Sequence, residues 1–347
     1  MGACWHAHCA RAAAPRRMGC LEFPGSCSRS VAWDCGHGHL GNQHRHLLPG
    51  MAMAVARPAA TRKLKAYYEL TKPGITLAVA LSMAAGYLLG LPEGIRGVGQ
   101  HGGHFLLTLL GTVLVSGGSG ALNHFAEWTT DQLMPRTRRR PIASGLLSPR
   151  QGLAWGIVLC TAGLAVLLFV DFLVLLLATL TVVLYIVVYT PMKRRSATAL
   201  YLGAVPGALP AAGGWIAASG PDWGALLVFA VLYLWQLPHF LALAWLYRKD
   251  YEQAGFPVLS LGELGKQRVG RQLVLASVGL GIAGGVLGAY LRASLLFILG
   301  SLFLAALLLG LALWFVRNPS FTTARQVLHG AYVYLFGFVA LSGVARL

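Results

Sequence analysis

Apolar residues gather in nine long runs along the chain, and shorter stretches rich in charged residues and glycine separate them. Each run comes close to the length of about 20 residues with which an α-helix crosses the hydrocarbon core of a bilayer. We therefore predict an all-α polytopic membrane protein in which every run forms one transmembrane helix. The predicted spans are residues 74–91, 104–127, 152–170, 172–190, 200–218, 223–246, 272–291, 294–316 and 326–345.

The composition agrees with this pattern, because 56% of the 347 residues are hydrophobic and only 11% are charged. A soluble globular domain of ordinary composition is excluded, since such domains carry about 25% charged residues. The net charge of +17 is divided among short basic clusters between the apolar runs. This distribution argues against nucleic acid as a partner and favours the lipid bilayer surface and an anionic substrate.

The basic clusters fall on one side of the predicted membrane. They occupy the segment before the first span and residues 136–150, 193–195, 248–271 and 317–325, whereas the opposite loops carry only Arg96, Arg292 and Arg346. Because cytoplasmic loops of membrane proteins hold an excess of lysine and arginine, we predict that the N-terminus and the polar loops are cytoplasmic. The expected location is the inner membrane of a bacterial cell.

The first 50 residues differ from the rest of the chain and contain five of its six cysteines. They have neither an apolar core nor the apolar stretch of a secretory signal peptide. We expect residues 1–50 to be a disordered extension or the result of a start codon assigned too early, with Met51 or Met53 opening the working protein. Residues 51–73 form a basic cytoplasmic lead-in, and residues 74–347 form the transmembrane domain.

Polar residues end the second predicted span. Asn123, Glu127 and Asp131 follow one another at intervals of four and therefore share one face of a helix. Two carboxylates at this spacing repel each other unless a cation lies between them. Oxygen donors without cysteine or histidine favour a hard ion, and magnesium binds one or two carboxylates, waters and substrate phosphates. We predict a magnesium site here; the alternative is a solvated helix end at the membrane surface.

Arginines follow this helix end directly, at positions 136, 138, 139 and 140. Guanidinium groups match phosphate oxygens, so the arginines and the acidic pair together indicate a diphosphate site. The alternative is that the arginines lie among lipid headgroups. A second basic group, Lys193, Arg194 and Arg195, ends the fourth span. It is expected to anchor that helix at the cytoplasmic surface, with phosphate contact as the alternative.

The sixth span carries a second group of polar residues. Pro238 is expected to weaken or kink this helix beside Gln236 and His239. Two roles stay open for His239, a hydrogen bond within the bundle or contact with a haem or a proton. The order of helix, acidic group, basic loop and helix repeats that of the second and third spans, which suggests two acidic helix ends facing one cavity. The residues at the cytoplasmic end are Tyr247, Arg248, Lys249, Asp250 and Tyr251.

Several ordered motifs resemble those of one enzyme family. The form N-xxx-E-xxx-D-xx-M-x-RT-xx-RP over residues 123–141 resembles the first signature of the UbiA superfamily of intramembrane prenyltransferases, in its haem O synthase branch, the protoheme IX farnesyltransferases. WQLPHFLALAW, with RKDY and AG behind it, is similar to the second signature of that branch. YELTKP, YTPMKRR and GALPAAGGW resemble its flanking motifs, so the resemblance covers roughly residues 66–345.

The resemblance implies a UbiA-like bundle of nine helices around a central cavity, with Mg²⁺ as cofactor. A farnesyl group would pass from farnesyl diphosphate to the vinyl group of haem b, giving haem O and diphosphate on the route to haem A and terminal oxidases. A haem A synthase would be the downstream partner.

The resemblance also implies roles for individual residues. Glu127 and Asp131 would hold the metal, with Asn123 orienting a ligand or water. Asp250, the fourth expected catalytic residue, would bind metal through water or orient Lys249. The expected substrate contacts are Arg136, Arg140, Lys193, Arg194, His239, Tyr247, Arg248 and Lys249.

The chain departs from the superfamily at two acidic positions. Glu127 stands where most members have Asp, and Tyr247 stands at the first position of the second acidic motif, with Asp250 at the other. The haem branch is similar in lacking that first acid, so the departures favour this branch and leave open whether a second magnesium binds. The alternatives are a UbiA-type prenyltransferase acting on an aromatic quinone precursor and a membrane transporter, which also buries charges at broken helices.

Overall fold

The computed structural model describes residues 59–346, and the expectations for residues 1–50 and for the start codon lie outside this part of the chain. Every regular element in the described part is a helix, which confirms the predicted fold class. Nine spans there are long and apolar enough to cross a membrane, so the chain is a multi-pass membrane protein. The spans are α2 (Pro73–Gly90), η1 with α3 (Gly94–Gly97, Val98–Asp131), α4 (Pro149–Leu168), α5 with η2 and α6 (Phe172–Val182, Val183–Tyr189, Thr190–Met192), α7 (Ala199–Ser219), α8 (Trp223–Leu246), α10 (Gly265–Leu291), α11 (Leu295–Arg317) and α12 (Phe321–Val344).

Three features differ from the sequence predictions. The second span begins at Gly94 and not at residue 104, because the glycine- and histidine-rich stretch before it is also helical. The fourth span contains a π-helical segment, η2. The basic lead-in contains a short helix, α1 (Ala59–Leu70). The sixth span, α8, continues as a helix through Pro238, the residue predicted to weaken or kink it.

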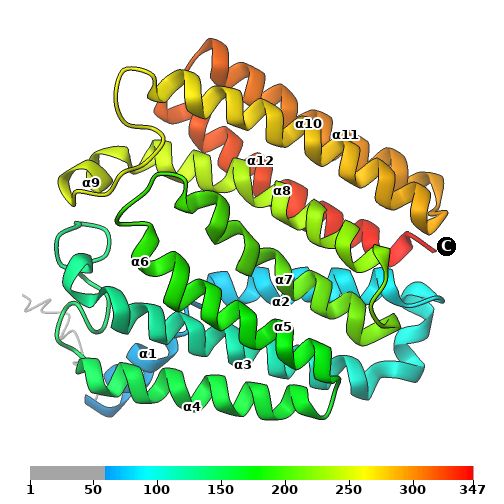
Figure 1. Cartoon of the computed structure of the whole chain (residues 1–347), viewed down its shortest axis with the longest axis horizontal. Coiled ribbons are helices and arrows are strands. Elements are labelled where there is room, and N and C mark those ends of the chain that lie inside the picture. The colour runs from blue at the N-terminus through cyan, green and yellow to red at the C-terminus, as the bar shows by residue number, and fades with distance from the viewer. Residues whose placement is uncertain (1–58, 347) are drawn as a thin grey trace, which may run out of the picture. The chain divides into compact units, whose positions relative to one another are not determined.

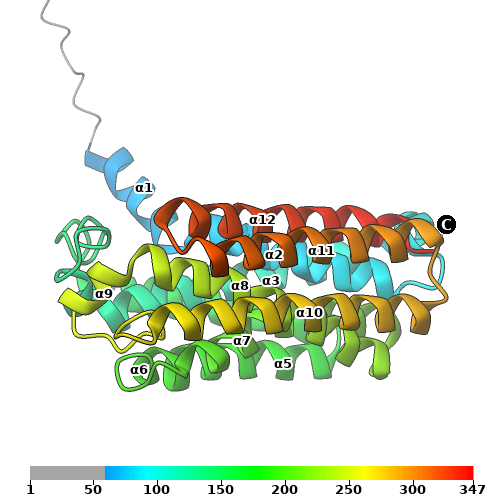
Figure 2. The same ribbon diagram turned by 90° about the horizontal axis from the view of Figure 1, so that it is seen from above.

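The helices run alongside one another in the part of the chain that follows α1 (Figures 1 and 2). α7 packs against α2, α5 and α8, and α12 packs against α2, α8 and α11. α3 lies between α2 and α4, whereas α10 lies between α8 and α11. This arrangement places α2, α3, α5, α7 and α8 around one interior space.

α1 lies outside the bundle and runs obliquely away from it near one end (Figure 2). Its buried side chains, Ala66 and Leu70, form a small apolar cluster with Ala121 of α3 and with Ile142 and Leu147 of the loop that follows α3. α1 therefore connects the start of the first span to this loop.

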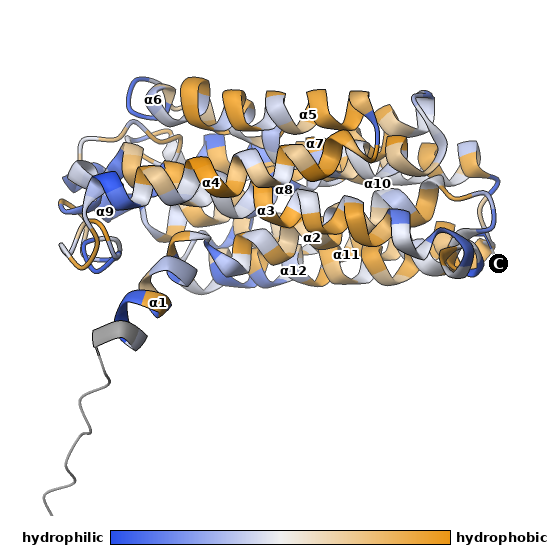
Figure 3. Ribbon diagram, turned by 90° about the horizontal axis from the view of Figure 1, so that it is seen from below, coloured by the Kyte–Doolittle hydropathy of each residue, from blue (hydrophilic) through white to orange (hydrophobic). Residues whose placement is uncertain are grey.

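The polar connections gather at one end of the bundle. The loops after α3, α6, α8 and α11 lie at the end that carries α9 (Arg248–Gln253), as does the turn between α1 and α2, and the connections after α2, α4, α7 and α10 lie at the other end (Figure 1). Hydrophilic residues are concentrated around α9 in Figure 3. The basic clusters thus share one end, as the alternation of spans and loops requires.

Glycines allow some of the helices to approach closely. A Cβ atom built on Gly86 of α2 would lie 1.9 Å from the carbonyl oxygen of Ala211 in α7, and one on Gly118 of α3 would lie 2.6 Å from Sγ of Cys160 in α4. Such distances leave no room for any side chain. These glycines therefore serve helix packing, which is the role of small residues in many membrane interfaces.

Candidate active site

A cavity of about 750 Å³ lies among α2, α3, α5, α7 and α8, with α12 reaching its wall. Apolar and small side chains form most of the lining. The charged residues of the lining are Lys72, Glu127, Arg140 and Lys193, and all four come from the ends of spans or from loops at the basic end of the bundle. The cavity therefore combines one charged end with a long apolar interior.

The last turns of α3 present three polar side chains at the charged end. Asn123, Glu127 and Asp131 are only 1%, 4% and 1% exposed, because their four-residue spacing puts all three on the inner face of α3. Asn123 and Glu127 line the cavity, whereas Asp131 is held by Arg140 just outside the lining. The alternative of a solvated helix end does not apply to these residues.

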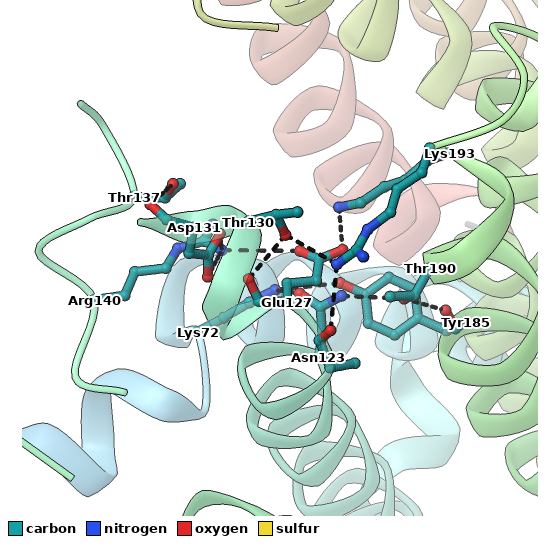
Figure 4. A network of polar contacts seen from close by, with 12 residues as sticks. Lys72, Asn123, Glu127, Thr130, Asp131, Thr137, Arg140, Tyr185, Thr190 and Lys193 are labelled. Atoms are coloured by element: carbon teal, nitrogen blue, oxygen red, sulfur yellow. Dashed lines mark hydrogen bonds and ion pairs between the residues drawn. The ribbon is translucent and has the colours of Figure 1, made fainter. Parts of the chain in front are cut away.

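Cations of the chain itself neutralise both carboxylates (Figure 4). Nη1 of Arg140 donates to both carboxylate oxygens of Asp131 at 2.8 Å and lies 4.0 Å from Oε2 of Glu127. Lys193 forms an ion pair with Oε1 of Glu127. The four-residue spacing required a cation between the two acids, and in this structure the guanidinium group of Arg140 is that cation.

Lys72 supplies a third cation. Its backbone is left-handed (φ 49°) in the turn before Pro73, and its ammonium group donates to Oδ1 of Asn123 and, over 3.3 Å, to the hydroxyl of Tyr185. Burial, and then the nearby positive charge of Arg140, lower the pKa of Lys72 to about 7. Lys72 therefore changes its charge near neutral pH.

The π-helical segment η2 contributes two tyrosines to the cavity wall. The rings of Tyr185 and Tyr189 stack with centroids 5.9 Å apart. The ammonium groups of Lys72 and Lys193 lie 5.9 Å and 5.8 Å from the centres of these two rings. Burial is the largest single influence and acts to lower the pKa of Lys193, but the carboxylate of Glu127 and the neighbouring Tyr189 and Tyr251 together raise that pKa. Lys193 therefore keeps its charge beside the tyrosines.

Sequence reasoning missed Lys72, Tyr185 and Tyr189 as residues of the site. Tyr185, Tyr189 and Lys193 are spaced at intervals of four, the same signal that identified the polar face of α3. The motif YELTKP contains Lys72, but its contact with Asn123 depends on how α2 meets α3. That contact is tertiary, and no local pattern reveals it.

Two of the predicted phosphate-binding residues lie outside the cavity. Arg136 stacks on the ring of Tyr247, with its guanidinium carbon 4.7 Å from the ring centre. Arg194 donates to the hydroxyl of Thr130 at 3.0 Å and thereby holds the end of α3 against the loop after α6. Both arginines connect loops at the charged end.

The residues around α9 also lie outside the cavity, with one exception. Arg248 donates to the backbone carbonyl of Trp245 at 3.0 Å, and Lys249 is exposed. Asp250 is half-buried in the first turn of α9 and is not part of the cavity lining. Tyr251, which follows it, does line the cavity. The structure therefore brings one acidic helix end to the cavity, not two.

His239 of α8 belongs to the wall of the cavity. Its ring lies 5.8 Å from the ring of Trp235 and 5.2 Å from that of Tyr332 on α12. Its Nδ1 atom has no hydrogen-bond partner among the described residues. This aromatic group forms a surface that a flat ligand can contact.

The sequence is similar to known prenyltransferases along most of its length. A profile of the UbiA prenyltransferase family matches residues 75–339. The protoheme IX farnesyltransferase of Solibacter usitatus is 36% identical over 288 residues, which are 78% of this chain and 95% of that protein. The protoheme IX farnesyltransferase of Sorangium cellulosum is 44% identical over 241 residues, which are 66% of this chain and 82% of that protein.

Solved structures share the fold. Digeranylgeranylglyceryl phosphate synthase matches with a TM-score of 0.66 at 15% identity, covering 82% of this chain and 98% of that one. A UbiA homolog from Archaeoglobus fulgidus bound to GPP and Mg²⁺ matches with a TM-score of 0.55 at 18% identity, covering 81% and 99%. The sequence motifs, the profile match and the helical bundle agree, and the chain belongs to the UbiA prenyltransferase family.

Proposed function

We propose that this prenyltransferase is a protoheme IX farnesyltransferase. C1 of farnesyl diphosphate bonds to the terminal carbon of a vinyl group of haem b, water adds its hydroxyl to the other vinyl carbon, and diphosphate and a proton are released. The observation that carries the proposal is a buried glutamate at the charged end of an apolar cavity, in a chain that matches protoheme IX farnesyltransferases over most of its length.

The charged end suits the diphosphate. Lys72, Arg140 and Lys193 bring three cations to a region with two carboxylates, those of Glu127 and Asp131. The region therefore attracts an anion when all three cations are protonated. As the bond between carbon and oxygen breaks, negative charge grows on the diphosphate and these contacts strengthen, which lowers the barrier.

The oxygen donors of α3 suit magnesium. Asn123, Glu127 and Asp131 offer an amide and two carboxylates on one face, and among the described residues no group of three or more histidine, cysteine, aspartate and glutamate side chains offers a complete protein cage. Such a donor set fits an ion that takes its remaining ligands from water and diphosphate. Bound there, Mg²⁺ would neutralise the diphosphate and make it a better leaving group.

In this proposal the other predicted site residues support the cavity without lining it. Arg136 and Tyr247 join the loops after α3 and α8, and Arg194 fixes the end of α3. Arg248, Lys249 and Asp250 belong to α9, and this short helix positions Tyr251 at the cavity. We therefore propose that these six residues shape the charged end from outside.

Haem b occupies the part of the cavity beside His239. The neighbouring rings of Trp235 and Tyr332 offer flat contacts for the macrocycle, and Nδ1 of His239 is available to the haem or to a proton. The apolar interior receives the farnesyl chain and keeps bulk water away from the allylic cation.

The proposed orientation follows from charge. The end with the basic loops faces the cytoplasm of a bacterial cell, across its inner membrane. Farnesyl diphosphate would then reach the charged end from the cytoplasmic leaflet, and haem O would pass from the bilayer to a haem A synthase.

The decisive experiment uses the purified protein with haem b and farnesyl diphosphate, with and without magnesium, followed by mass analysis of the haem. The expected product is haem O, formed only with the metal. Prenylation of hydroxybenzoate without prenylation of haem would instead support the quinone-precursor alternative. A transporter is disfavoured by the family of the chain, and magnesium-dependent release of diphosphate in detergent would exclude transport as its sole activity.

A further inference from the structure

We propose that Gly213 of α7, together with Val174 of α5, sets the longest prenyl chain that the cavity accepts. This inference rests on the proposed function and adds the part of the protein that selects among prenyl diphosphates. It concerns the apolar interior, which contributes none of the charged residues described above.

Gly213 lies deep in the cavity. On the same helix, Gly203 packs against the ring of Tyr189 beside the charged end, and Gly213 follows ten residues later. At 1.5 Å per residue, this separation is about 15 Å along the helix. A diphosphate bound at the charged end would therefore extend its hydrocarbon chain towards Gly213.

The missing side chain of Gly213 leaves open space. A Cβ atom built there would meet only Cγ1 of Val174, at 3.9 Å, which is an ordinary contact distance. The neighbouring glycines differ, because a Cβ would lie 1.9 Å from Oε1 of Gln236 at Gly207 and 2.1 Å from the carbonyl oxygen of Met83 at Gly214. Packing against the backbone requires a glycine at position 214, and a side chain at position 207 would have to displace the amide of Gln236. Neither restriction applies to Gly213, although glycine within a helix costs stability relative to alanine.

The surroundings of Gly213 suit a hydrocarbon. Val115, Leu167, Val174 and Leu177 line the cavity with it, whereas the charged lining residues among those described all lie at the other end. Haem carries two carboxylates, which have no cationic partner in this region. A prenyl tail needs no such partner, so the interior fits the tail better than the haem.

The test is a comparison of Gly213→Leu and Val174→Ala with the wild-type protein. Each is assayed with haem b and with geranyl, farnesyl or geranylgeranyl diphosphate. Because one methylene in an apolar pocket changes kcat/KM by between about tenfold and two-hundredfold, Gly213→Leu should shift the preference at least tenfold towards geranyl diphosphate. Val174→Ala should shift it towards geranylgeranyl diphosphate, with the KM for haem unchanged in both variants.

The matched control is Gly310→Leu, because Gly310 is an exposed helical glycine of α11 with no atom within 4 Å of the position that a Cβ atom would take. It should leave the chain-length preference unchanged. An unchanged preference in Gly213→Leu would overturn the inference, as would a raised KM for haem with no change in preference. Should Gly213→Leu fail to fold, Val174→Ala alone decides.

Binding of unreactive thiolo analogues of the three diphosphates separates this inference from the proposed function. If the wild-type protein binds the analogues but does not prenylate haem, the proposed acceptor is wrong. The affinities of the variants for analogues of different length still test Gly213. If the affinity for the analogues depends on their chain length in the same way in the wild type and in Gly213→Leu, the role of Gly213 is refuted, whatever the acceptor is.

Discussion

Glu127 is the residue on which the chemistry at the charged end depends most, because it contacts the cavity and two cations at once. Glu127→Gln keeps the shape of the side chain and removes its charge, which leaves Lys193 without its ion pair. We expect kcat to fall by about 10²- to 10³-fold, as when one electrostatic contact to a transition state is lost. The measurement is the rate of haem O formation at saturating substrates.

The control for this variant is Glu263→Gln, because Glu263 is exposed in a loop at the same end of the bundle. It should keep the wild-type rate. Both variants should insert into membranes in equal amounts. A wild-type rate in Glu127→Gln would remove the proposed metal role of this residue.

The ionisation of Lys72 predicts that the affinity of the charged end for an anion depends on pH. With a pKa of about 7 it carries its charge below neutral pH and loses it above, so it attracts an anion only on the acidic side. We expect the affinity for pyrophosphate, measured calorimetrically without metal, to fall as the pH rises through 7. Pyrophosphate also ionises in this range, and Lys72→Arg corrects for that change because arginine stays charged. The ratio of the wild-type affinity to that of Lys72→Arg should fall with pH; a constant ratio would contradict the expectation.

The charges at the site also bear on metal binding. Arg140 and Lys193 already neutralise the two acidic side chains, so a free divalent ion would have to displace them. We expect Mn²⁺, followed by electron paramagnetic resonance, to bind at least tenfold more tightly when inorganic pyrophosphate is present to draw these cations away. Lys193→Met should bind Mn²⁺ without pyrophosphate. Equal Mn²⁺ affinity with and without pyrophosphate in the wild-type protein would contradict this explanation.

For single residues, the sequence predicted those members of the site that follow a regular spacing along one helix. Asn123, Glu127 and Asp131 share a buried face because helical geometry alone requires a shared face. The partners of these residues come from distant parts of the chain. Lys72 is 51 positions before Asn123, and Arg140 reaches back from a loop, so tertiary packing decides their contacts.

The contact between α2 and α7 shows what holds neighbouring helices together. Gly86→Ala would put a methyl group 1.9 Å from the carbonyl oxygen of Ala211 and force the two helices apart. We expect a loss of stability of about 1–3 kcal/mol, the usual cost of overpacking, seen as a lower Tm in detergent. Gly310→Ala is the matched control, because alanine favours the helix and meets nothing there. Equal Tm values for the two variants would contradict this packing role.

Whole helices were more predictable than their irregular parts. Nine apolar runs gave nine spans in the described part of the chain, because the bilayer fixes the length and polarity of a crossing helix. The π-helical segment η2 has the same apolar composition as the rest of its span, so hydropathy does not distinguish it. α1 was missed because it is a short amphipathic helix without the long apolar run of a membrane span.

For the molecule as a whole, the position of the basic loops predicts a single orientation. A cysteine placed at the exposed Gln253 of α9 should react with an impermeant thiol reagent only from the cytoplasmic side. A cysteine at the exposed Pro221, in a connection at the opposite end, should react only from the other side. Labelling of intact spheroplasts and of inverted vesicles distinguishes the two. The reverse pattern would place the charged end outside the cytoplasm.

The position of α1 determines how far the chain can be shortened from its beginning. A protein started at Met51 retains all of α1, so it should retain full haem O synthesis. A start beyond Leu70 would remove the residues that pack against Ile142, which lies two residues after Arg140 in the loop. It would also release the turn that positions Lys72. We therefore expect the smallest active version of this enzyme to include a helix that is not one of its membrane spans.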